Sequence, residues 1–138
     1  MVGLTRGATK NHIVRAALEA MAYHTADVLS LMEAESGIPL ALLKVDGGAS
    51  ANNFLLQFQA DILHAELLRP QCIETTALGA ATLAGLAVGL YASTDEIAQN
   101  QQSDRIFIPT MAEEKRQRLL RNWKKAVSRA RDWEALEN

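Results

Sequence analysis

Apolar residues in the first part of the chain recur at steps of three and four, which is the spacing of one helix face. This pattern predicts a helix over about 10–35. Thr9 or Asn11 can cap its start, because a side-chain oxygen there accepts a free backbone N–H, and Gly37 and Pro39 end it. The positions expected on its buried face are Ile13, Ala16, Ala17, Ala20, Tyr23 or His24, Val28, Leu31 and Met32.

The next apolar segment, 41–45, is continuous and does not alternate with polar residues. It predicts a short strand buried on both faces, as in a parallel sheet that is covered by helices. The strand stops at a glycine turn, 46–48, and a helix is predicted almost at once over about 52–63. A second short strand is predicted over about 66–69, where Pro70 ends it.

The last part of the chain begins with small and apolar residues that predict a helix over about 77–88, which Thr75 or Thr76 can cap. Gly79 and Gly85 lower helix propensity, so we expect this helix to be packed tightly inside the protein. The apolar run 77–92 is 16 residues long, too short for a membrane span. Beyond it the pattern predicts a short helix over about 94–99, an extended segment over 105–108 and a long helix over about 111–133.

This order of elements predicts an α/β fold, with a small parallel sheet and flanking helices. Only two strands are strongly indicated, whereas a typical sheet has about five or six. We therefore expect residues 1–138 to form a single domain that is truncated at its N-terminus, with further strands upstream.

Composition narrows the classes of partner. The chain has 138 residues, of which 49% are hydrophobic and 22% charged, and a net charge of −2, which indicates neither a nucleic-acid partner nor a membrane. Its single cysteine, Cys72, excludes an intramolecular disulfide and fits a cytoplasmic setting. The three histidines, His12, His24 and His64, are not at the spacing of a helical metal pair, so we expect no metal site. The basic residues of 115–131 are distributed over all faces of their predicted helix, and acidic residues flank them. This pattern favours a solvated helix surface over nucleic-acid binding.

The glycine turn is the main candidate for chemistry. A strand, a glycine turn and a helix start together suit a phosphate or a nucleotide, because glycine admits a ligand close to the backbone and free N–H groups favour negative charge. The alternative from the residues alone is an ordinary turn in which Asn52 caps the helix. Asp46 at the strand end is interpreted as a structural hydrogen-bond acceptor in preference to a catalytic acid or a metal ligand.

Several segments together resemble a known family. In their order and spacing they are similar to the C-terminal part of the FGGY carbohydrate kinases, and within that family to the glycerol kinases. The FGGY kinases belong to the actin-like ATPases, whose domains are ribonuclease H-like. The segments that carry the resemblance are 3–7, 11–16, 45–49, 51–55, 57–63, 76–81, 83–89 and 123–127.

The resemblance implies a function. In these kinases two actin-like domains close over ATP with Mg²⁺, and the γ-phosphate passes to a hydroxyl of glycerol to give glycerol 3-phosphate. It implies that Gly48 offers a backbone contact to ATP or ADP, that Asn52 lies near the adenine or ribose, and that Gly47 permits the turn. It also implies that the catalytic aspartate and the glycerol-contacting residues lie upstream. We therefore assign no catalytic residue to this chain and expect it to be inactive alone, because phosphoryl transfer depends on positioning all reactants together.

Two alternatives stay open. The first is another FGGY sugar or polyol kinase, because no residue in this chain is expected to contact the sugar or polyol. The second is a non-catalytic structural or interaction module of the same fold. In either case, truncation predicts exposed apolar surface and unpaired strand edges, and hence a homo-oligomer or other self-association.

Overall fold

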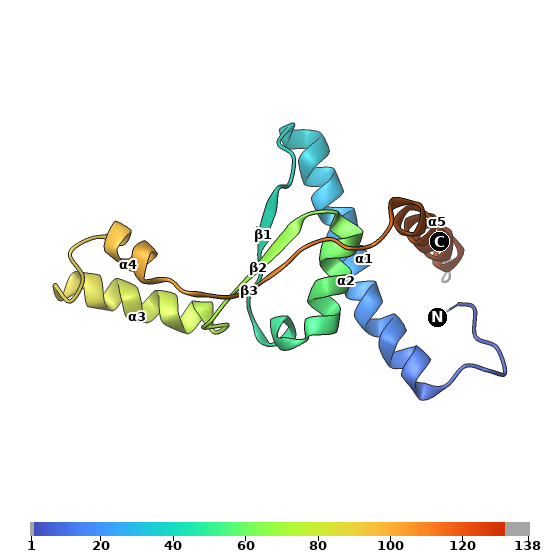
Figure 1. Cartoon of the computed structure of the whole chain (residues 1–138), viewed down its shortest axis with the longest axis horizontal. Coiled ribbons are helices and arrows are strands. Elements are labelled where there is room, and N and C mark those ends of the chain that lie inside the picture. The colour runs from blue at the N-terminus through green and yellow to red at the C-terminus, as the bar shows by residue number, and fades with distance from the viewer. Residues whose placement is uncertain (1, 132–138) are drawn as a thin grey trace, which may run out of the picture.

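The computed structural model describes residues 2–131 and shows helices on both sides of a small central sheet (Figure 1). In chain order the elements are α1 (Lys10–Ser36), β1 (Leu42–Lys44), the 3₁₀ helix η1 (Gly48–Ala51), α2 (Asn53–Leu63), β2 (Glu66–Pro70), α3 (Thr75–Ala87), α4 (Thr94–Asn100), β3 (Ser103–Phe107) and α5 (Glu113–Ala130). Each predicted element is present. Trp133, the predicted end of the last helix, lies outside the described residues.

The sheet has three strands in the order β1-β2-β3. β1 and β2 are parallel, with Leu43 opposite Leu67, which confirms the predicted parallel pair. β3 runs antiparallel to β2, with Phe107 opposite Leu67, so the sheet is mixed, whereas a small parallel sheet is predicted from the sequence. The reason is the connection: α3 and α4 lie between β2 and β3, and the chain returns along β2 in the opposite direction (Figure 1).

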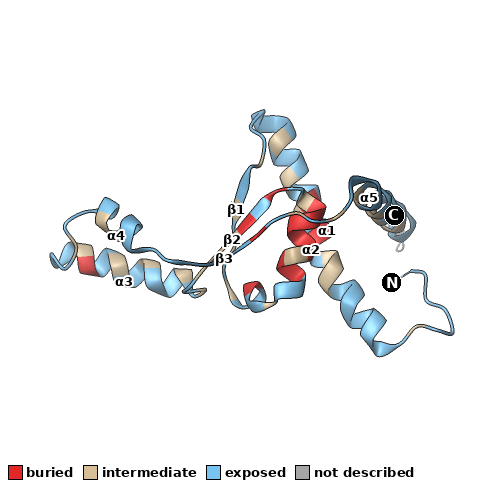
Figure 2. Ribbon diagram, viewed as in Figure 1, coloured by how far each residue is buried: buried red, intermediate tan, exposed pale blue. Residues whose placement is uncertain are grey.

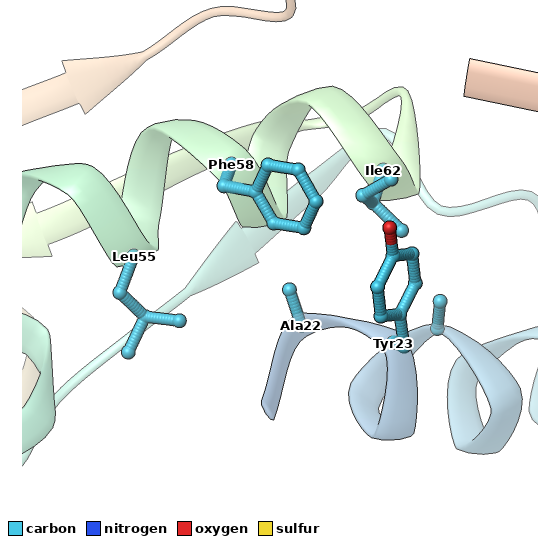
Figure 3. Close-up of a cluster of buried hydrophobic side chains, with 6 residues drawn as sticks. Ala22, Tyr23, Leu55, Phe58 and Ile62 are labelled. Carbon is cyan, nitrogen blue, oxygen red and sulfur yellow. The ribbon is translucent and has the colours of Figure 1, made fainter. Parts of the chain in front are cut away.

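α2 lies at the centre of the molecule, and its buried side chains belong to two hydrophobic clusters (Figure 2). One face packs on the sheet, in a cluster of Leu56, Ala60, Leu67 and Phe107. The other face packs on α1 in a cluster of Ala22, Tyr23, Ala26, Leu55, Phe58 and Ile62 (Figure 3). Leu119, Leu120 and Trp123 of α5 pack against this cluster. Because both clusters depend on α2, this helix fixes the position of everything that adjoins its ends.

Aromatic rings connect α1, α2 and α5. The ring of Tyr23 stacks on Trp123 with centroids 5.1 Å apart and meets the edge of Phe58 at 5.5 Å. The indole N–H of Trp123 donates to Asp27 at 2.7 Å, which satisfies its polar atom. Burial raises the pKa of the Tyr23 phenol to about 12, and the nearby Glu19 carboxylate adds to this effect.

Helix ends follow the predicted signals. Thr9 precedes α1, and its backbone N–H donates to the His12 ring at 3.1 Å. Gly37 follows α1 and adopts the left-handed conformation, at φ 69°. Its N–H donates to the backbone carbonyl of Glu33 at 2.9 Å. α3 begins two residues earlier than predicted, at Thr75, so this threonine is its first residue and not its cap.

Three predictions about burial are wrong within the described chain. β1 is expected from the sequence to be buried on both faces, but Leu42 and Lys44 are exposed and Leu43 is only half-buried. α3 was expected inside the protein, but it projects away from α1, α2 and α5 (Figure 1), and Gly85 is its only buried residue. Leu83 on this helix is 65% exposed. On α1, the apolar stripe at Val28, Leu31 and Met32 is also exposed. In both helices the exposed side chains are apolar, and the described residues supply no second apolar surface to cover them.

Candidate functional site

The glycine turn joins β1 to α2 and is built on one residue with a special backbone conformation. Gly47 has φ 78° and ψ 170°, a region that is essentially restricted to glycine. Its N–H donates to the Ile73 carbonyl at 2.8 Å, which ties the turn to the segment after β2. The structure thus supports the expectation that Gly47 permits the turn.

Gly48 has a different reason to be glycine. Its φ is not positive, and a Cβ built on it would meet nothing within 4 Å. Neither backbone conformation nor crowding inside the chain therefore requires glycine at this position. A glycine with open space above it is what close approach of a ligand to the backbone demands.

The carbonyl groups around the turn are already occupied. The Gly47 carbonyl accepts two bonds from Ser50, from its N–H at 3.0 Å and from its hydroxyl at 2.7 Å. Ser50 is only 2% exposed, and its own carbonyl accepts from Arg69 at 2.8 Å. By contrast, the N–H groups of Gly48 and Ala49 have no partner within residues 2–131. The turn thus presents two free donors.

Asn52 begins α2. Its Oδ1 accepts the N–H of Leu55 at 3.1 Å, which is the geometry of a helix cap, so the capping role considered from the sequence is present. Because the cap uses the side-chain oxygen, the amide nitrogen is the part of Asn52 that can serve a ligand. Capping and binding are compatible uses of this one side chain.

Asp46, which the sequence indicates is a structural hydrogen-bond acceptor, accepts a hydrogen bond from a side chain at the start of α3. Its Oδ2 accepts the hydroxyl of Thr75, the first residue of α3. This bond and that of the Gly47 N–H to Ile73 hold the glycine turn against the start of α3. Between these elements lies a hollow of about 590 Å³, and Lys44, Asp46, Cys72, Thr75, Gly79 and Tyr91 are among its lining residues.

Arg69 on β2 was not singled out from the sequence, where surface ion pairing is the usual role of an arginine. In the structure its side chain is 12% exposed and donates to both the Ser50 carbonyl and the Asn53 side chain. The only distinctive feature of Arg69 in the local sequence is that it directly precedes Pro70. That feature does not reveal its contacts with residues that lie 16 to 35 positions away in the chain.

A second hollow, of about 470 Å³, lies between α1, α2 and α5, lined by Arg15, Phe54, Phe58, Asp61 and Lys115 among others. It is built on different residues from the glycine turn. Within residues 2–131, no group of three or more His, Cys, Asp or Glu is arranged to hold a metal ion. None of the helices in this same part of the chain has the length and apolarity to cross a membrane.

Comparison with known proteins assigns the family. The model of the FGGY family of carbohydrate kinases, C-terminal domain, matches residues 1–88. The chain belongs to the FGGY family of carbohydrate kinases. The resemblance that was identified from the motifs is therefore confirmed.

The relatives of this FGGY chain include many glycerol kinases. It is 65% identical over 133 residues to a glycerol kinase of Caldanaerobacter subterraneus and 61% identical over 134 residues to one of Deinococcus radiodurans. These alignments cover 96% and 97% of this chain but 27% of each relative. The chain thus spans about a quarter of the length of the curated relatives that it matches.

Solved structures agree with this assignment. A Plasmodium falciparum glycerol kinase with ADP superposes with a TM-score of 0.80 at 35% identity, over 93% of this chain and 26% of that one. A gluconate kinase from Lactobacillus acidophilus superposes with a TM-score of 0.70 at 26% identity, over 93% of this chain and 26% of that one. The mixed α/β arrangement is therefore the fold of this part of the family.

Proposed function

We propose that this chain is the nucleotide-binding portion of an ATP-dependent glycerol kinase, within the C-terminal part of its second actin-like domain. The observation that carries the proposal is identity of 61% and 65% to two glycerol kinases over nearly the whole chain. The solved gluconate kinase is only 26% identical, which favours glycerol over another sugar or polyol as the substrate of the whole enzyme. ATP supplies the γ-phosphate, and the product is glycerol 3-phosphate.

The residues of the glycine turn fit one end of ATP or ADP. The free N–H groups of Gly48 and Ala49 would donate to the nucleotide, and the open space at Gly48 would admit it to the backbone. The Asn52 amide nitrogen would donate near the adenine or ribose while its oxygen caps α2. Gly47 would contribute through its backbone conformation alone. The ADP-bound glycerol kinase of similar fold supports a nucleotide as the ligand.

The chemical step is proposed to depend on residues outside this chain. Mg²⁺ would accompany ATP in the whole enzyme, and no residue of this chain is assigned to it or to catalysis. Glycerol would contact the upstream part only. We also propose a cytoplasmic location, because the chain is similar to glycerol kinases. The exposed free thiol of Cys72 agrees with this location.

A chimera tests this proposal. The matching 133 residues of the Caldanaerobacter enzyme are replaced by this chain, and glycerol-dependent ADP release is measured. We expect the chimera to retain activity and this chain alone to have none. A chimera that unfolds in one transition like its parent but releases no ADP would contradict the proposal and favour a non-catalytic module. Because the chimera takes its glycerol contacts from the relative, this assay tests nucleotide use and not the choice of substrate.

We also propose that the isolated chain self-associates. Just after the end of α3, Val88 is 81% exposed and Leu90 is 71% exposed, and β1 and β3 are the two edges of the sheet. Sedimentation over a range of concentrations is expected to show a mass that rises above 15.1 kDa. A constant monomer mass at the highest concentration would refute this expectation.

A further inference from the structure

Arg69 holds the turn that carries the free N–H groups. Its Nη1 donates to the Ser50 carbonyl at 2.8 Å and to Asn53 Oδ1 at 2.9 Å, and its Nε donates to Asp104 at 2.7 Å. One guanidinium therefore connects η1, the start of α2 and β3. We propose that Arg69 is a positioning residue for the nucleotide, an inference that rests on the proposed function of the glycine turn.

The chain of bonds that leads from Arg69 to the donors is short. Arg69 fixes the carbonyl of Ser50, and the N–H and hydroxyl of Ser50 fix the carbonyl of Gly47. Gly48 and Ala49 lie between these two anchored residues. Their N–H directions are therefore set from both sides, without direct contact between Arg69 and a ligand.

The turn needs such an anchor. η1 has four residues, and a 3₁₀ helix of this length has poor hydrogen-bond geometry and little stability of its own. A donor that points in one direction before the ligand arrives avoids the entropy cost of ordering it on binding. Arg69 supplies this order from β2, the central strand of the sheet.

The guanidinium itself is held in place. Asp104 on β3 accepts from both Nε and Nη2, the latter at 2.6 Å, so its carboxylate fixes the plane of the group. The ring of Phe107, which is 1% exposed, lies 5.4 Å from the Arg69 Cζ. A lysine at this position has a single ammonium on a flexible stem, so it does not reproduce the planar fork that serves all three acceptors.

The test compares Arg69→Lys with a matched control, Arg116→Lys. Arg116 also donates from Nε to a backbone carbonyl, that of Ile62 at 2.8 Å, and pairs with a carboxylate, Glu113 at 3.0 Å. It lies at the opposite end of α2 from the turn, so the two variants lose similar bonds at different places. The probe is ADP, titrated into each purified chain and followed at resolved backbone amides, and hydrogen exchange is measured without ADP.

For Arg69→Lys we expect ADP binding about tenfold weaker than for the unaltered chain, equivalent to about 1.4 kcal/mol. Exchange should accelerate at the Ser50 and Asn52 amides, whose bonds to Gly47 and Ala49 define η1, and stay unchanged at Ile62. Arg116→Lys should leave ADP affinity and both η1 amides as they were. In the chimeric kinase, Arg69→Lys should raise KM for ATP and leave KM for glycerol within about twofold.

The inference is overturned if Arg69→Lys keeps the original ADP affinity and exchange at Ser50. It is also overturned if exchange accelerates equally at Ile62, because that result would show general loosening and not loss of position at the turn. If the unaltered chain does not bind ADP at all, the proposed function fails for this chain. The exchange comparison between the two variants then still decides whether Arg69 orders the turn.

Discussion

The adjacent glycines of the turn are expected to respond in opposite ways to the same change. Gly47→Ala forces an alanine into φ 78° and ψ 170°, a conformation that costs a residue with a side chain about 1–3 kcal/mol. Gly48→Ala places its methyl group where no atom lies within 4 Å and where φ is not positive. It should therefore stabilise the fold by about 0.4–1 kcal/mol, because alanine has fewer unfolded conformations to lose.

Urea unfolding of the two variants and the unaltered chain measures these differences. The midpoint should fall for Gly47→Ala and rise slightly for Gly48→Ala, with unchanged slopes. ADP titration supplies the second half of the prediction: Gly48→Ala should bind ADP more weakly although it is the more stable protein, because its methyl group fills the space left for the ligand. Equal destabilisation by both changes, or full ADP affinity in Gly48→Ala, would refute the reasoning.

Three further changes test the surrounding structure. Asn52→Ala removes the α2 cap and should lower the free energy of unfolding in urea by about 1 kcal/mol. An unchanged free energy of unfolding would show that the cap does not stabilise the fold. Asp61→Ala removes the acceptor of the Thr110 and Met111 N–H groups, at 2.7 and 3.1 Å, and should cost about 3 kcal/mol; a change under about 0.5 kcal/mol would contradict it. Replacing the other tyrosine of the chain, Tyr91→Phe, leaves Tyr23 as the only phenol. Its phenolate absorbance should then titrate near pH 12. Since folding raises the Tyr23 pKa from 10.0 to about 12, its stabilising contribution is complete below pH 10 and is lost as the pH rises toward 12; a midpoint at 10.0 would refute this.

The sequence revealed the parts of the fold that local chemistry determines. The cap at Asn52, the glycine after α1 and the two parallel strands each follow from residues close together in the chain. The same holds for the site: Gly47 stands in a backbone conformation that its position in the turn suggested. These features need no knowledge of distant contacts.

The parts that the sequence did not reveal depend on distant residues. Arg69 is 35 positions from Asp104 and 19 from Ser50, so nothing local distinguishes it from a surface arginine. The antiparallel direction of β3 depends on the path of the connection through α3 and α4. The exposure of α3 was missed for a similar reason. Hydrophobicity indicates that a helix needs an apolar surface to pack against, but it does not show which part of the protein supplies that surface.

Titration of ADP into the unaltered chain, followed at individual backbone amides, tests whether the glycine turn binds a nucleotide. We expect saturable shifts at the Gly48 and Ala49 amides and none at Ser128 on α5. Gly48→Ala should reduce the affinity in the same experiment. Absence of saturable shifts at these two amides, or shifts of equal size along the whole chain, would contradict the assignment of the glycine turn as the nucleotide site.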